Sequence, residues 1–288
     1  ELVWLLGEAG STQAAQAMIA RWRSEDVDAA LQYVRADWST VLDTATVRTP
    51  DRAFDLMLNG WLLYQVLACR VWARSAFYQS SGAYGFRDQL QDTMALILAQ
   101  PALAREHLLR AAGRQFLEGD VQHWWLPQTG RGVRTRVSDD RVWLGYCVAH
   151  YVETTADAGV LDERVPFLDG PALQSNETDN FFLPTAGEQS ATLFEHCARG
   201  LDSSLAVGSH GLPLIGTGDW NDGMNDVGAA GRGESVWLGW FLHFVLSAFV
   251  PIAEARGDHT RVATWRAHAA ALRSSLEEHG WDGDWYRR

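Results

Sequence analysis

Apolar positions along this 288-residue chain recur mostly at helical spacing, and strand-like alternation is scarce. The segment 51–74 is apolar on nearly every face, as an inner helix of a layered bundle would be. Similar helical patterns follow at 87–100, 101–117, 139–155, 188–206, 234–256 and 259–279. The pattern therefore predicts an all-α fold.

Residues 1–48 differ from this helical body. An apolar run that ends at Gly7 resembles the last strand of something that precedes it, so we expect the chain to begin within a longer protein. Ser11 or Thr12 can cap a helix that reaches Trp22, and Ser24 can cap a second one. We predict a helical linker here.

Three long loops stand out between the predicted helices, at 78–86, 119–137 and 208–233. Loops longer than about 12 to 15 residues are usually functional. Short and long connections alternate along the chain, which is typical of stacked helical hairpins. We therefore expect a toroid of paired helices with the long loops gathered at one mouth.

The segment 236–253 needs a membrane test because it is almost wholly apolar and close to the ~20 residues that span a bilayer. It also contains His243 and Pro251, and acidic Glu234 and Glu254 flank it without a basic collar. We interpret it as a fully buried helix of a large α-domain.

Charge and composition exclude several classes of function. The 36 acidic residues outnumber 24 basic ones, and the resulting charge of −12 repels nucleic acid and anionic membranes. Every basic residue is arginine, so no lysine is present for Schiff-base chemistry. Three separated cysteines on apolar stretches indicate reduced, buried thiols and a cytoplasmic setting.

The third loop places Asp219, Trp220 and Asp222 among closely spaced glycines. Glycines permit tight backbone paths that can aim a carboxylate and an indole into a cavity. A simple polar turn is an equally good interpretation, because Asn, Asp and Gly dominate turns. A calcium loop fails on spacing, since Gly223 occupies a ligand position.

The first loop ends with Arg87 and Asp88 at a helix start. An acidic residue there can simply favour the helix N-terminus and pair with the arginine on the surface. Alternatively, the two side chains bind sugar hydroxyls, and the arginine can also face an anion. The residues alone leave both interpretations open.

The second loop and the helix start after it are rich in aromatic and charged side chains. Fourteen tryptophans are many for this length, and indole faces beside carboxylates and arginines suit a sugar ring. A plain capped helix start, with its arginines ion-paired or on a rim, is the alternative. The candidate sugar-binding residues are His123, Trp124, Trp125, Arg134, Asp139 and Asp140.

Other chemistries lack their motifs. The nine histidines are scattered, and Glu195, His196 and Cys197 are consecutive, so their side chains diverge around a helix. We predict no metal site and interpret His196 as a structural histidine. Nucleophile-elbow, phosphate-loop and dinucleotide motifs do not occur in the sequence.

Four separated loop motifs together resemble glycoside hydrolase family 94, the inverting glycoside phosphorylases. The resemblance covers essentially the whole chain and is nearest to the phosphorylase-like domain of cyclic β-1,2-glucan synthases. In chain order, the motifs are SAFYQSSGAYGFRDQLQD from residue 75, GDVQHWW from 119, GRGVRTRVSDD from 130 and GTGDWNDGMN from 216.

The resemblance implies an (α/α)6 barrel that follows a β-sandwich and a helical linker. Residues 1–10 would be the tail of the sandwich, 11–48 the linker, and 49–288 the N-terminal part of the catalytic barrel. The family's barrel continues beyond residue 288, and its phosphate-binding histidine and threonine lie in that portion. We therefore expect an incomplete barrel. Residues 1–288 by themselves would lack the family's phosphate-binding residues, so we do not predict whether they are active without the rest of the barrel.

By motif position, the resemblance implies that Asp222 is the general acid, and that Trp220, Arg87 and Asp88 line the glucosyl subsite. Asp219 lies in the same motif. Inorganic phosphate would be the co-substrate, with no cofactor. Partial burial beside Trp220 would favour the protonated form of Asp222. Cysteine usually stands at position 223 in the cellobiose-type members, so Gly223 favours the glucan-synthase branch.

The expected partners are a β-gluco-oligosaccharide and phosphate, not nucleic acid. A homodimer and a larger parent protein anchored in the inner membrane are further expectations. One alternative is an inverting hydrolase with Asp88, Asp139 or Asp140 as the base, and another is a non-catalytic glucan-binding module. A terpene-cyclase-like toroid would require an acidic metal-binding helix, for which Asp139 and Asp140 are too little.

Overall fold

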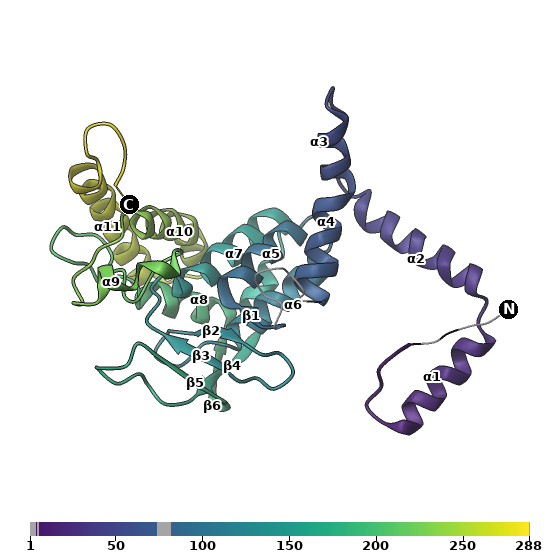
Figure 1. Cartoon of the computed structure of the whole chain (residues 1–288). Helices are drawn as coiled ribbons and strands as arrows, with labels where there is room; N and C mark the ends of the chain where they lie inside the picture. Colours follow the sequence, from purple (N-terminus) through teal and green to yellow (C-terminus); the bar gives the residue numbers. More distant parts are fainter. Residues whose placement is uncertain (1–3, 5, 74–81, 288) are drawn as a thin grey trace. The chain divides into compact units, whose positions relative to one another are not determined.

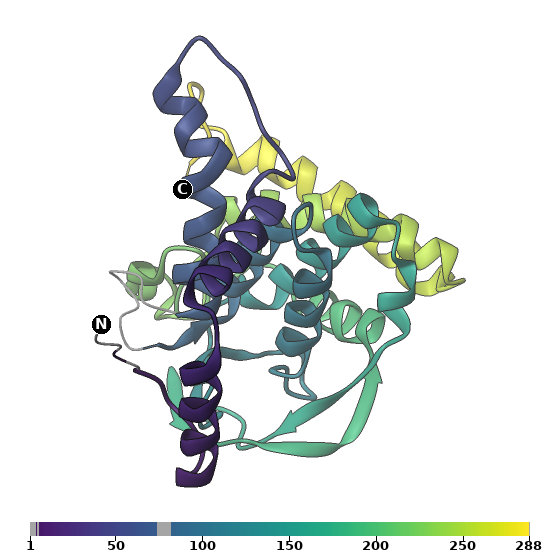
Figure 2. The same ribbon diagram turned by 90° about the vertical axis from the view of Figure 1, so that its right-hand side faces the viewer.

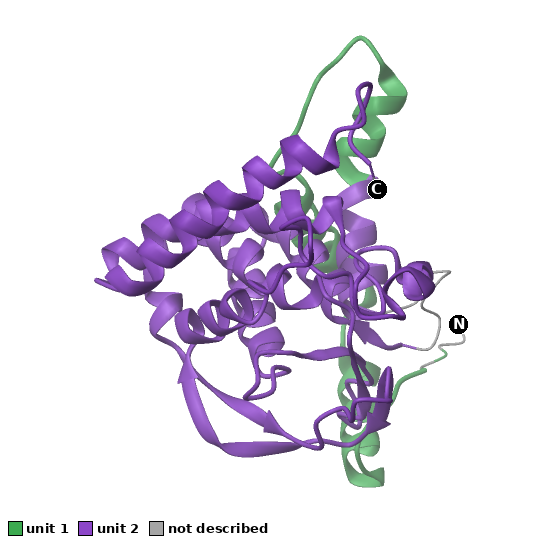
Figure 3. Ribbon diagram, turned by 90° about the vertical axis from the view of Figure 1, so that its left-hand side faces the viewer, with its two compact units in different colours: residues 1–60 green, residues 61–288 purple. Residues whose placement is uncertain are grey.

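The computed structural model describes residues 4, 6–73 and 82–287. It divides into two compact units, residues 1–60 and 61–288, shown in different colours in Figure 3. The predicted sandwich tail and the predicted first loop both fall partly outside the described residues.

Unit 1 consists of helices. Ser11 caps α1 by accepting a hydrogen bond from the backbone N–H of Ala14. Asp26, not the predicted Ser24, caps the next helix and accepts from the N–H groups of Asp28 and Ala29. The elements of unit 1 are α1 (Thr12–Ser24), α2 (Val27–Leu42) and α3 (Arg52–Leu56), with the π-helical turn η1 (Met57–Trp61) at its boundary with unit 2.

Unit 2 is mostly helical (Figure 1). Its α-helices are α4 (Leu62–Gln65), α5 (Phe86–Leu96), α6 (Pro101–Ala112), α7 (Asp140–Thr155), α8 (Leu193–Asp202), α9 (Asn225–Gly228), α10 (Val236–Ala255) and α11 (His259–Ser275). Its 3-10 and π-helical turns are η2 (Val66–Trp72), η3 (Ala158–Asp162), η4 (Asp222–Met224) and η5 (Leu276–Gly280).

Six strands among the described residues correct the all-α prediction. They are β1 (Tyr84–Gly85), β2 (Gln122–Trp125), β3 (Gly132–Thr135), β4 (Arg164–Asp169), β5 (Asp179–Phe182) and β6 (Thr185–Thr192). One antiparallel sheet has the order β1-β2-β3-β5, and β4 pairs with β6 in a long two-stranded ribbon (Figure 3). The incomplete (α/α)6 barrel stays a prediction.

Two sequence expectations fail where tertiary pairing decides the local structure. The predicted helix 188–206 is instead the end of β6 followed by α8, because Thr192 caps the helix and the residues before it pair with β4. The predicted loop 119–137 contains β2 and β3, which pair with each other.

Helix α10 packs side by side with α11 and also contacts α7 (Figures 1 and 2). It is long and apolar enough to cross a membrane by length and composition, and half of its most apolar window is buried. Leu242, Val245 and Phe249 are fully buried, whereas Phe244 is exposed. The prediction of a fully buried helix therefore holds for one side of α10 only.

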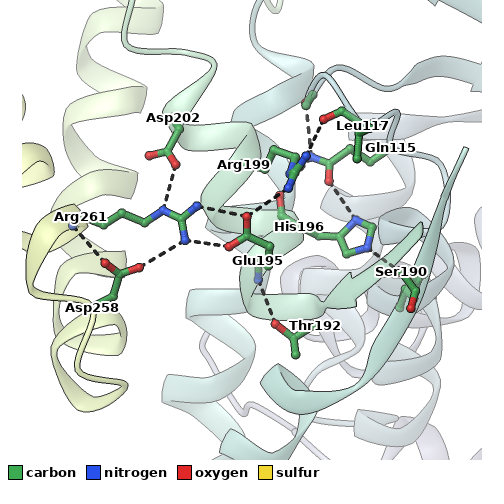
Figure 4. A network of polar contacts seen from close by, with 12 residues as sticks. Gln115, Leu117, Ser190, Thr192, Glu195, His196, Arg199, Asp202, Asp258 and Arg261 are labelled. Carbon is green, nitrogen blue, oxygen red and sulfur yellow. Dashed lines mark hydrogen bonds and ion pairs between the residues drawn. The ribbon is translucent and has the colours of Figure 1, made fainter.

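An ion-pair network ties α8 to α11 (Figure 4). Arg261 donates to Glu195, Asp202 and Asp258, so one guanidinium joins three carboxylates. His196 is completely buried in α8, and its ring nitrogens contact the Gln115 side chain and a backbone carbonyl. These contacts give His196 a structural role.

Candidate active site

Glycines bring the third loop close to the start of α7. Gly216 has a φ of +65°, and a Cβ there would lie 2.0 Å from the carbonyl oxygen of Arg136. Gly228 packs on Gly216 so closely that a Cβ would lie 1.7 Å from the Gly216 oxygen. Ser138 donates its N–H and hydroxyl to the Gly218 carbonyl, at 2.9 and 3.1 Å. The Asp-Trp-Asn-Asp motif begins directly after this anchor.

Asp219 stabilises the third loop through hydrogen bonds of its buried side chain. Its side chain is fully buried, and it accepts a 2.6 Å hydrogen bond from the Ser235 hydroxyl and a 2.9 Å bond from the Asn221 N–H. Ser235 also caps α10 through the Leu238 N–H. Asp219 therefore joins the loop to the start of α10 rather than facing the site opening.

Arg87 is the hub of the site. It lies in the first turn of α5 and is buried. Its Nη1 donates to Asp139 Oδ1 at 3.2 Å and to the backbone oxygen of Asp219 at 2.9 Å, while its Nη2 donates to Asp222 Oδ1 at 2.6 Å. Burial opposes the charged form, yet Asp139, Asp140 and Asp222 together raise the pKa of Arg87. Arg87 is therefore a fixed cation that joins the start of α7 to the third loop.

Asp139 holds Nη1 of Arg87, whereas Asp222 contacts Nη2. Asp139 is fully buried at the start of α7, and besides Arg87 it accepts a 2.9 Å hydrogen bond from Trp143 Nε1. Burial and the neighbouring Asp140 raise the pKa of Asp139 above its ordinary value, against the opposing effect of Arg87. Since Asp139 has no exposed surface, it positions Arg87 and cannot activate a water from bulk solvent.

His123 on β2 lies between two carboxylates. Its Nδ1 is 2.8 Å from Asp140 Oδ2, and its Nε2 is 3.9 Å from Asp222 Oδ1. Burial of the ring opposes its charge, but Asp140 and Asp222 raise the pKa of His123 to about 9. The ring is therefore cationic at neutral pH.

Asp222 and Trp220 form the open side of the site. Asp222 begins the turn η4, and its side chain is 56% exposed. Trp220 is 52% exposed. The sequence-based expectation that burial beside Trp220 would protect the proton of Asp222 is wrong, because the loop turns both side chains toward solvent. The contacts of Asp222 are instead with two cations.

Asp88 follows Arg87 in the first turn of α5. Its side chain is 34% exposed and lies 3.8 Å from the guanidinium of Arg70. Among the carboxylates that we considered as a hydrolytic base, Asp88 is more accessible than Asp139 and Asp140, which are both buried.

The structure places three predicted residues away from the Arg87 cluster. Arg134 is buried, donates to Asp120 and Glu118 and lies over the ring of Phe116, so its guanidinium organises the sheet. Trp125 is buried in the core, with Tyr84 edge-on against it. Trp124 is partly buried and packs against Phe181 at 5.3 Å between ring centroids.

Three residues of the site were not predicted as such: Trp143, Ser235 and Ser138, whose hydroxyl donates to the Gly218 carbonyl. Trp143 follows Asp139 by four residues, a spacing that places both side chains on one face of a helix. That spacing could have identified it. Ser235 contacts Asp219 only through the fold, and the local sequence carries no signal for this contact.

A separate cavity of about 1000 Å³ is lined in part by the same loop. Its walls include Thr135, Thr217, Ser204 and Asp226. Within the described part of the chain, no group of three or more His, Cys, Asp or Glu side chains could hold a metal ion.

Comparison with known proteins identifies the class. Residues 37–288 match the glycosyl hydrolase 94 superfamily, catalytic domain, and the chain belongs to this family. The match begins inside the predicted linker.

Individual relatives cover the chain as follows. The cyclic beta-(1,2)-glucan synthase NdvB of Rhizobium meliloti is 53% identical over all of this chain and 10% of its own length. Solabiose phosphorylase of Paenibacillus borealis is 30% identical over 97% of the chain and 33% of its own length. The 1,2-beta-oligoglucan phosphorylase of Listeria innocua is 26% identical over 67% of the chain and 18% of its own length. The chain thus spans a third or less of each.

Proposed function

We propose that this chain carries the general-acid part of an inverting phosphorylase site that acts on β-glucosidic bonds. The observation that carries the proposal is the contact of Asp222 with Arg87, at 2.6 Å, on the open side of a buried charged cluster. The substrate would be β-1,2-glucan or a related β-gluco-oligosaccharide, and the product α-glucose 1-phosphate.

The chemistry needs one acid and one nucleophile on opposite faces of the sugar ring. Protonated Asp222 gives its proton to the glycosidic oxygen as the bond from that oxygen to C1 breaks. A phosphate oxygen bonds to C1 from the other face, which inverts the anomeric centre. Phosphate is already anionic at neutral pH, so it needs no carboxylate base.

The relatives support the substrate class, because one is named for synthesis of cyclic β-1,2-glucan and another for phosphorolysis of 1,2-β-oligoglucan. Burial of Asp139 and Asp140 disfavours either of them as the water-activating base of a hydrolase. Asp88 is the remaining candidate for that role, so hydrolysis is the outcome against which phosphorolysis has to be tested.

The test is an assay of the full-length protein on β-1,2-gluco-oligosaccharides with and without inorganic phosphate. We expect α-glucose 1-phosphate to form only when phosphate is present. Equal release of reducing sugar in both conditions, with free glucose as the product, would establish hydrolysis instead. Binding of the oligosaccharide without any turnover would indicate a non-catalytic glucan-binding module.

A further inference from the structure

His123 is a positively charged group close to Asp222, on which negative charge forms during catalysis. This inference rests on the proposed function, in which Asp222 begins the chemical step as a neutral acid. As the proton moves to the glycosidic oxygen, negative charge develops on the Asp222 carboxyl group. Fixed positive groups aimed at such a developing charge lower the barrier, because they need no reorganisation during the reaction.

Two cations are fixed around Asp222 Oδ1. The guanidinium of Arg87 touches it, and Nε2 of His123 lies 3.9 Å away. The second distance is beyond a direct hydrogen bond, so His123 acts on this oxygen through its charge or through one bridging water. His123 on β2 is partly buried, with 17% of its side chain exposed, whereas the Asp222 side chain is 56% exposed on its loop.

The charge on His123 is maintained by its other ring nitrogen. Nδ1 lies 2.8 Å from the buried carboxylate of Asp140 at the start of α7. This contact orients the ring so that Nε2 faces Asp222. The charged groups around the ring are Asp140, Asp222 and Arg87, and the first two outweigh the third, with the pKa of His123 raised to about 9.

We propose that His123, held by Asp140, is a positioning residue that acts through Asp222: its positive charge stabilises the carboxylate that forms as Asp222 protonates the leaving group. His123 therefore contributes to proton transfer rather than to binding of the sugar.

The discriminating experiment compares two leaving groups in the full-length protein. His123→Gln keeps a polar side chain but removes the charge, and His259→Gln, at the exposed start of α11, is the matched control. One substrate is the β-1,2-linked gluco-oligosaccharide, whose leaving oxygen needs a proton. The other is 2,4-dinitrophenyl β-glucoside, whose leaving group departs without one.

We expect His123→Gln to lower kcat/KM about tenfold on the oligosaccharide near pH 6 and to leave the dinitrophenyl substrate within about threefold of the unmodified protein. The control should change neither quantity.

Equal losses on both substrates would overturn the proposal, since a purely structural defect slows both substrates alike. Asp140→Asn provides a second reading, because it should reproduce the selective loss above neutral pH, where His123 then loses its charge. The readout also separates this inference from the phosphorylase proposal: hydrolysis would need the same proton from Asp222, so the leaving-group comparison remains valid whichever nucleophile the protein uses.

Discussion

Arg87 and Asp222 are 135 residues apart in the chain, and their side chains are joined by a 2.6 Å hydrogen bond. Arg87 approaches from the first turn of α5, while Asp222 approaches from the glycine-rich loop. The buried carboxylate of Asp139 holds the same guanidinium from behind. The position of the proposed acid is therefore fixed by Arg87, which is itself held by the buried Asp139.

Replacing Arg87 by lysine tests this positioning. A single ammonium group cannot reproduce the planar fork that reaches Asp139, the Asp219 carbonyl and Asp222 together. We expect Arg87→Lys to lower kcat/KM by about 100-fold, which corresponds to about 2.7 kcal/mol of transition-state stabilisation. Steady-state kinetics on the full-length protein measure this loss. Arg266→Lys, on the exposed side of α11, is the control and should keep full activity.

The pairing of His123 with Asp140 predicts a pH-dependent contribution to stability. The folded-state pKa of about 9 lies above the unfolded value of 6.5, so this stabilisation is complete below pH 6.5 and is lost as the pH rises through 9. We expect His123→Gln to lower the free energy of unfolding by about 1–3 kcal/mol at pH 6 and by much less at pH 10. Denaturant unfolding at both pH values measures the difference. A loss of the same size at both would contradict the ion pair.

Helix spacing and capping predict much of the helical framework. The predicted helices 139–155 and 259–279 correspond to α7 and to α11 with η5, because their apolar positions repeat and Asp258 caps the second. The sequence of β6, TAGEQSAT, lacks the alternation of apolar residues that indicates a strand. Pairing with β4 decides its conformation, and only the fold supplies that partner.

The site was predictable as a set of residue types but not as a geometry. Sequence reasoning selected Arg87, Asp139 and Asp222, yet it could not tell which carboxylate is buried and which is open. The same limit applies to Arg134. Its partners Asp120 and Glu118 lie 14 and 16 residues earlier and turn it away from the Arg87 cluster.

The close approach of Gly228 to Gly216 predicts a strong effect of a single methyl group. In Gly228→Ala, the new Cβ would lie 1.7 Å from the Gly216 carbonyl oxygen, so the loop backbone must move. We expect activity to fall by at least about tenfold, because Asp222 lies between these two glycines in the same loop. The control is Gly60→Ala, where a Cβ meets nothing within 4 Å. That change should leave activity as it is, and normal activity in Gly228→Ala would argue against the packed loop.

The network around Arg261 predicts a difference between two arginines of α11. Arg261 joins Glu195, Asp202 and Asp258 (Figure 4), whereas Arg266 makes one exposed ion pair with Glu254. We expect Arg261→Gln to lower the free energy of unfolding by about 1–3 kcal/mol, since it leaves three carboxylates without their shared partner. Arg266→Gln should cost at most about 0.5 kcal/mol. Thermal unfolding of both variants measures the contrast, and equal shifts would mean that the network adds nothing.

The central claim is that Asp222 supplies the proton. The most direct measurement is the rate of α-glucose 1-phosphate formation from a β-1,2-gluco-oligosaccharide and phosphate by the full-length protein and by Asp222→Asn. Asp226→Asn, an exposed carboxylate of the same loop, serves as the matched control. We predict that Asp222→Asn lowers the rate by about 1000-fold or more while Asp226→Asn stays within about threefold of the unmodified protein. An Asp222→Asn protein that forms α-glucose 1-phosphate at the unmodified rate would contradict the account.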